Sequence, residues 1–149
     1  MNYLLESEKS INIWFSHEHS DHFNIPFIRS LKDNEINCKI FFQKTTDKRV
    51  FNFLKLNKFN IIECTDGEEY RIGKDLMLSV YSYVAGDSFC FLRTGTKNIL
   101  NINDCVINNE HTAIKSLSRL PKNAKVDILF TQFGYANWIG RKEDAKLKK

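Results

Sequence analysis

The chain has 149 residues, of which 42% are hydrophobic and 27% are charged, and its formal net charge is +4. This balance is typical of a folded globular domain and excludes a disordered protein. No segment reaches the roughly 18 continuous apolar residues of a membrane span, and no basic segment with an apolar signal core begins the chain. We therefore expect one domain over residues 1–149, in the cytoplasm and without a membrane partner.

The first apolar segment, residues 11–15, predicts a strand, and the run HEHSDH follows it at positions 17–22. A lone histidine after a strand is usually a surface or hydrogen-bonded residue. Three imidazoles and a carboxylate, however, gain little from crowding unless a cation joins them, and such donors suit zinc and also accept iron or manganese. If the backbone stays extended, His17 and His19 point to one side, while Asp21 and His22 follow in a turn and can face a second ion.

Strand and helix alternate after this run, in the rhythm of β-α-β units. Pro26 suits a first helical turn, and Thr46-Asp47 is expected to cap the second helix. The expected elements are a helix at 27–32, a buried strand at 38–42, a helix from 46 to about 57 and a strand at 60–64.

From residue 66 the pattern changes to that of an antiparallel meander, with turn glycines between strand-like segments. The segments are 75–84, 88–94 and 97–103, followed by a helix at about 110–119 and an apolar strand at 126–130. The third of these strands delivers Asp104 at its C-terminal end, where a loop carboxylate can reach a metal. The whole pattern predicts an α/β (α+β) fold.

The four cysteines are far apart and form no C-x-x-C pair. We expect Cys38, Cys64 and Cys90 to pack as small hydrophobes in strands. Cys105 directly follows Asp104, so two interpretations stay open for it, namely packing or a thiol at the edge of the metal site.

The run at 17–22 after an apolar strand resembles the signature of the metallo-β-lactamase-fold superfamily of metal-dependent hydrolases. Segments 14–26, 99–105 and 127–138 look like the branch that contains lactonase-like proteins and the hydrolase-like domain of CMP-N-acetylneuraminate hydroxylase. The resemblance implies a metallo-β-lactamase-like αββα sandwich, incomplete at the N-terminus because only residues 1–10 precede the first strand. Such a partial domain would be completed by a separate chain or would form a homo-oligomer.

The resemblance also implies a ligand set. His17 and His19 would hold a first zinc ion, Asp21 and His22 a second, and Asp104 would bridge both, with one or two ions in all and Mn²⁺ or Fe²⁺ as alternatives. Asp21 would in addition be the catalytic general base for a metal-activated water.

The chain departs from this family at two ligands, because the family normally has a further histidine before the bridging aspartate and another near the C-terminus. The only histidine outside the run is His111, for which we expect an exposed or helix-capping role. Asp87 lies where the middle histidine is expected, and it is either a substitute oxygen ligand or, more commonly, a turn residue in a hairpin.

Three functions are compatible with these features. The resemblance implies a metal-dependent hydrolase that acts on a small-molecule lactone, ester, amide or phosphoester. The missing histidines favour a non-catalytic metal-binding or interaction module with a partial site. Nucleic-acid binding is the least favoured, because Lys and Arg are scattered and concentrate only in the basic tail 141–149. Tyr135 and Trp138 either line the mouth of a pocket or pack in the core.

Overall fold

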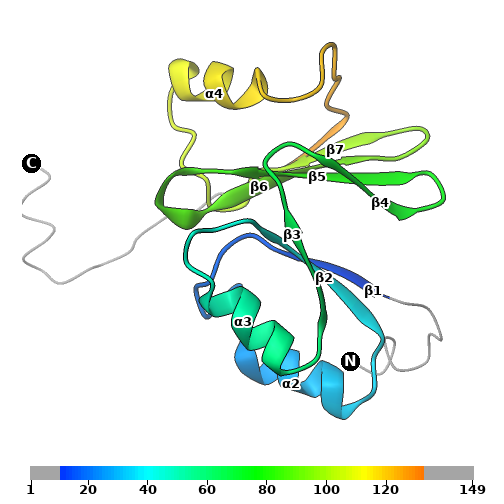
Figure 1. Cartoon of the computed structure of the whole chain (residues 1–149). Helices are drawn as coiled ribbons and strands as arrows, with labels where there is room; N and C mark the ends of the chain where they lie inside the picture. The colour runs from blue at the N-terminus through cyan, green and yellow to red at the C-terminus, as the bar shows by residue number, and fades with distance from the viewer. Residues whose placement is uncertain (1–10, 133–149) are drawn as a thin grey trace, which may run out of the picture.

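The computed structural model describes residues 11–132, so Tyr135, Trp138 and the basic tail 141–149 lie outside the described residues. Two stacked sheets form the centre of the molecule, with α2 and α3 on the outer face of one sheet and α4 on the outer face of the other (Figure 1). This is the expected αββα arrangement. The elements are β1 (Ile11–Phe15), α2 (Ile25–Asp33), β2 (Cys38–Gln43), α3 (Arg49–Leu56), β3 (Asn60–Cys64), β4 (Glu69–Gly73), β5 (Leu76–Ser82), η1 (Val84–Gly86), β6 (Ser88–Arg93), β7 (Asn98–Asn101), α4 (Glu110–Leu117) and β8 (Ile128–Phe130).

The first sheet is parallel, with the order β1-β2-β3 and the central strand in register with both neighbours. Helices α2 and α3 make the two crossovers, which confirms the β-α-β prediction. Helix α2 begins after Asn24, whose side chain accepts a hydrogen bond of 2.9 Å from the backbone N–H of Phe27, and Pro26 lies in its first turn. These residues suit a helix start because they satisfy or remove N–H groups that have no partner within the helix.

Helix α3 begins later than the sequence suggested. We expected Thr46-Asp47 to cap it, but Lys48 is the N-cap residue and makes no side-chain capping bond. Asp47 still contributes, because its carboxylate accepts a hydrogen bond of 2.9 Å from the backbone N–H of Arg49, the first helical residue. The polar stretch before Arg49 is therefore used as a turn, in which short polar side chains bond to nearby backbone.

The second sheet has the order β4-β5-β6-β7-β8. Strands β5, β6 and β7 are antiparallel, as the meander prediction requires, and β4, which was not expected from the sequence, adds a further antiparallel strand beside β5. Strand β8 pairs with β7 in parallel after the α4 crossover. Strand β8 is shorter than the expected 126–130. Among the described residues no helix is long and apolar enough to cross a bilayer.

Strand β2 supplies side chains to two separate parts of the core. Ile40 and Phe42 pack with the helices on one face, and Phe41 packs on the other face against residues of the second sheet such as Leu78 and Val80. Alternation along a strand buried on both faces produces this division. The free thiols Cys38, Cys64 and Cys90 are buried in the same clusters, which agrees with the packing prediction, and burial raises the pKa of Cys64 and of Cys90 to about 12.

Phe41 therefore joins the two sheets, and its side chain is only 1% exposed. We expect Phe41→Ala to lower the free energy of unfolding by about 3 to 5 kcal/mol, through lost burial and the cavity left behind. Urea titration followed by circular dichroism measures this change. Leu56→Ala is the matched control, because that side chain is 82% exposed and the change should stay within about 0.5 kcal/mol. Equal effects of the two variants would contradict the packing described.

Candidate metal centre

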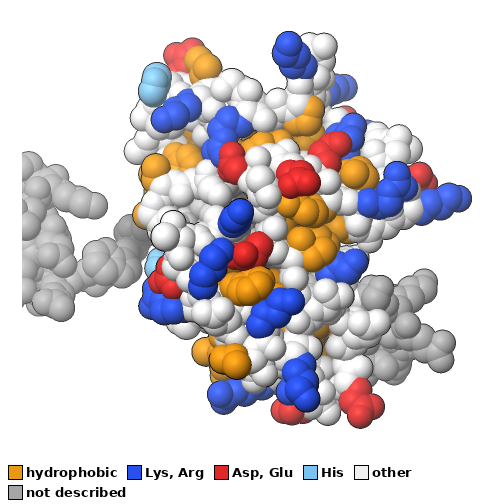
Figure 2. Space-filling model, viewed as in Figure 1, with side chains coloured by type: hydrophobic (Ala, Val, Ile, Leu, Met, Phe, Trp, Pro, Cys, Tyr) orange, Lys and Arg blue, Asp and Glu red, His pale blue; other side chains and the backbone are white. Residues whose placement is uncertain are grey.

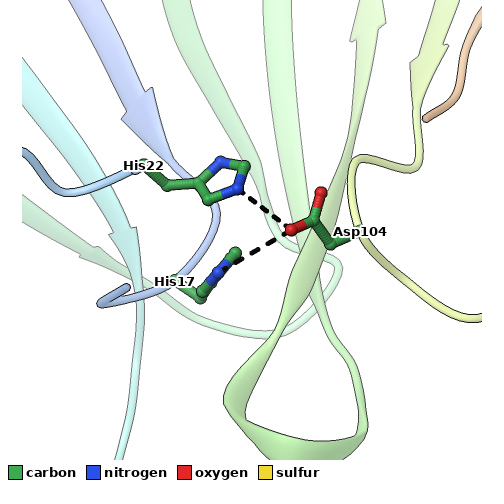
Figure 3. Close-up of side chains that lie close together, drawn as sticks. All are labelled: His17, His22 and Asp104. Atoms are coloured by element: carbon green, nitrogen blue, oxygen red, sulfur yellow. Dashed lines mark ion pairs between the residues drawn. The ribbon is translucent and has the colours of Figure 1, made fainter. Parts of the chain in front are cut away.

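The run at 17–22 leaves the C-terminal end of β1, and Asp104 lies in the loop after β7, so the two stacked sheets bring these segments together. Figure 3 shows His17, His22 and Asp104 with the two imidazoles directed at the carboxylate. The side chains that face each other here are more than 80 residues apart in the sequence, as shown by His22 and Asp104. The fold, and not the local sequence, assembles this centre.

The loop itself is a tight turn anchored by an aromatic residue. The backbone N–H groups of His22 and Phe23 both donate to the carbonyl of His19, at 3.0 and 2.7 Å. Phe23 is buried and packs edge-on against Phe15, with ring centroids 5.1 Å apart. The chain bends from His17 onward instead of staying extended, yet the rings of His17 and His19 still meet edge to face, with centroids 4.5 Å apart.

His17 is the most buried member of the run, with 3% of its surface exposed. Burial is the main cause that lowers its pKa below the usual 6.5, and the nearby rings of His22 and His19 act in the same direction, while Asp87 and Asp104 oppose them. Its Nδ1 atom lies 3.0 Å from Ser16 Oγ and 3.1 Å from Asp87 Oδ1. Its Nε2 atom is buried without a hydrogen-bond partner among the described residues.

Two groups of side chains present atoms that could hold an ion. His17, His22 and Asp104 form one group, and His17, His19 and Asp21 form the other, with the ligand atoms of each group within 4.8 Å of one another. His22 Nε2 lies 3.0 Å from Asp104 Oδ2 and 3.5 Å from Asp21 Oδ2. All five residues named from the sequence are thus brought together, and the side chain common to both groups is His17.

The donor set fits a divalent cation. A buried nitrogen without a partner costs free energy, and His17 Nε2 faces Asp104 Oδ2 at 4.0 Å, too far for a hydrogen bond. A cation between these two atoms would satisfy both of them. Imidazole nitrogens and carboxylate oxygens are donors that zinc accepts readily.

The side chains of the centre are held in place by residues that were not predicted from the sequence. Ser16 is buried, and its carbonyl accepts hydrogen bonds from Gln43 Nε2 at 3.3 Å and Ser88 Oγ at 2.6 Å. Its hydroxyl accepts a bond of 2.8 Å from Asn103 Nδ2. Ser16 thereby connects the ends of β1 and β2, the start of β6 and the loop after β7. Gln43 is a polar residue at the end of a buried apolar strand. This is the feature of the sequence that could have indicated a supporting role for these residues.

The other candidates lie outside the two groups. Cys105 is buried in a core cluster with Leu120, and burial together with the charges of Asp87 and Asp104 raises its pKa to about 12, which supports packing. His111 is exposed in the first turn of α4, as expected, while Asn109 is the capping residue. Asp87 lies in the turn between η1 and β6, as the hairpin interpretation predicts, and it contacts His17.

A cavity of about 190 Å³ adjoins the centre. His17 and His19 line one side of it, and Phe42 and Val50 supply apolar surface. Asp47 also lines it and is paired with Arg49, which in turn binds Glu18 at 2.8 Å on the rim. The centre is therefore open to a small molecule with both an apolar and a polar part.

Asn103 adopts a left-handed backbone conformation, with φ at +46°, directly before Asp104. We expect Asn103→Ala to lower the free energy of unfolding by about 1 to 3 kcal/mol, because alanine is strained there and the bond to Ser16 is lost. Asn103→Gly loses the bond but not the conformation, so it should be the more stable variant by about 1 kcal/mol. Thermal unfolding of both variants measures the difference, and a glycine variant no more stable than the alanine variant would contradict this account.

No protein-family model and no curated protein sequence matches the chain. Among solved structures, the chain is similar to a mutant of the CmlA β-hydroxylase, with a TM-score of 0.67 and 14% identity over 83% of this chain and 26% of that one. It is also similar to the short form of human tRNase Z, with a TM-score of 0.50 and 12% identity over 79% of this chain and 56% of that one.

The chain thus spans about a quarter of the first protein and just over half of the second. At these identities the likeness establishes the fold alone. Both neighbours contain the fold of the metallo-β-lactamase superfamily, and the layers and sheet order described above agree with it. The chain therefore has a metallo-β-lactamase-like αββα fold.

Proposed function

We propose that this chain is a metal-dependent hydrolase whose centre consists of His17, His19, Asp21, His22 and Asp104. The observation that supports this most strongly is the buried Nε2 atom of His17, which faces Asp104 and has no hydrogen-bond partner within residues 11–132. Zinc is the ion that this donor set suits best, with manganese or iron as alternatives. Bound ions would supply Lewis acidity, which lowers the pKa of a water molecule and polarises a carbonyl or phosphoryl oxygen.

The protein groups have distinct roles in this proposal. His17, His22 and Asp104 are buried or half-buried, so their positions are fixed by packing and they hold the ion. The side chain of Asp21 is 76% exposed beside His22, so its carboxylate is free to accept a proton from a water molecule. The cavity next to His17 and His19 would accept the substrate, with Phe42 and Val50 against its carbon skeleton. A small lactone, ester, amide or phosphoester fits this description.

The alternative is a non-catalytic module that holds one ion. All three histidines of the centre come from one loop, and the fourth histidine of the chain, His111, is exposed on α4. A single ion held by His17, His22 and Asp104 would stabilise the junction of the two sheets without presenting a complete reaction centre. Metal stoichiometry distinguishes this alternative from the hydrolase.

Elemental analysis of protein purified without chelator tests the metal centre. We expect two zinc-class ions per native chain and their loss in the double variant His19→Ala, Asp104→Ala, because one member of each ligand group is removed. His111→Ala is the matched control and should keep the native metal content. About one ion per native chain would favour the non-catalytic module, and no bound metal would contradict both.

Activity is tested on the zinc-loaded protein with chromogenic lactones, esters and phosphoesters. We expect Asp21→Asn to lower kcat by about 100- to 10,000-fold, the usual effect of removing a general base. Metal content is measured on the same preparation, so that loss of an ion and loss of the base are separated. If the metal-loaded native protein hydrolyses none of these substrates, the hydrolase proposal fails.

A further inference from the structure

Asp87 contacts His17 on the side of the ring that faces away from the candidate ion. Asp87 Oδ1 lies 3.1 Å from His17 Nδ1, and the two side chains are 19% and 4% exposed. Asp87 belongs to neither ligand group, although it comes from a region where the sequence left a ligand role open. Asp87 contacts Nδ1 of His17 and not Nε2. This position is that of a residue that orients His17, not of one that binds the ion itself.

The two neutral forms of His17 differ in how they suit this environment. If the proton is on Nε2, the lone pair of Nδ1 faces the Asp87 carboxylate at 3.1 Å, and the two repel each other. The Nε2–H group would then be buried without an acceptor among residues 11–132, because Asp104 is 4.0 Å away. If the proton is on Nδ1, it faces the carboxylate and the Ser16 hydroxyl, and Nε2 presents a lone pair.

We propose that Asp87 is a positioning residue that keeps the proton of neutral His17 on Nδ1 and leaves Nε2 free as the metal-binding atom. The inference rests on the metal centre proposed above. Carboxylates that bind the second nitrogen of a metal-binding histidine fix the tautomer and the ring orientation, and removing one typically weakens metal affinity about 10- to 100-fold.

The turn that carries Asp87 is held in one conformation. Ala85 and Gly86 both have positive φ, at +58° and +83°. For alanine this conformation is strained, and it persists only where surrounding contacts hold it. The backbone carbonyl of Asp87 accepts a bond of 2.7 Å from the N–H of Tyr83, and the carbonyl of Gly86 accepts one from Gln43 Nε2. Gln43 also binds the Ser16 carbonyl, so the turn and His17 are fixed to the same strand end.

The tautomer is read in the metal-free protein by nitrogen-15 NMR of its histidine side chains, at a pH where His17 is neutral. Zinc affinity is measured separately, by competition with a chromophoric chelator. We expect the native protein to show His17 protonated on Nδ1. In Asp87→Ala and in Asp87→Asn, whose amide can donate to Nδ1, we expect a shift towards the Nε2 form and zinc binding weakened about 10- to 100-fold. Asp75→Asn, an exposed carboxylate in the β4–β5 turn, is the control.

Each result bears on the proposal. A native His17 protonated on Nε2 would overturn it, as would Asp87 variants that leave the tautomer unchanged. Weaker zinc binding with an unchanged tautomer would instead make Asp87 a ligand. A shifted tautomer with native zinc affinity would remove the link to metal binding. If the native protein binds no zinc, the proposed function fails while the tautomer measurement still reports on Asp87. The two Asp87 variants guard against a folding defect in one of them.

Discussion

Burial of the His17 imidazole is the constraint around which the ends of both sheets are organised. A buried imidazole must remain neutral or find charged partners, and here carboxylates face both of its nitrogens. One nitrogen has Asp87 and Ser16 within 3.1 Å, whereas the other has no hydrogen-bond partner in the part of the chain that the structure describes. This asymmetry is what a metal-binding histidine requires, because one nitrogen fixes the ring and the other presents its lone pair.

The fold supports this arrangement through backbone groups at the strand ends. Because β1 and β2 are parallel, their C-terminal ends lie at the same edge of the first sheet, where Ser16 and Gln43 meet. The second sheet contributes Ser88 at the start of β6 and Asn103 after β7, and both bind Ser16. The junction of the two sheets is therefore polar around Ser16, whose carbonyl and hydroxyl are both hydrogen-bonded, while Phe41 and its neighbours form the apolar contact between the sheets.

The parts of this structure that depend on local sequence could be predicted. The alternation of strands and helices and the meander follow from periodicity and turn residues, and the donor chemistry of the run at 17–22 predicts a candidate metal site there. The proposed ligand role of Asp104 is what the family resemblance implies. The Ser16 network and the contact between Asp87 and His17 could not be predicted, because they join residues 27 to 87 positions apart through side chains that are common in any sequence. The late start of α3 was missed because Asp47 bonds to the backbone as a turn residue would, without being the cap.

The central claim is that His17 Nε2 is a metal-binding atom in a centre of nitrogen and oxygen donors. X-ray absorption at the zinc edge of the zinc-loaded protein tests it most directly, because imidazole, carboxylate and thiolate ligands give different scattering distances. The account predicts nitrogen and oxygen ligands only, with scattering from several imidazoles that decreases in His17→Ala and is unchanged in His111→Ala. A sulfur ligand, or a spectrum that is the same in His17→Ala as in the native protein, would contradict it.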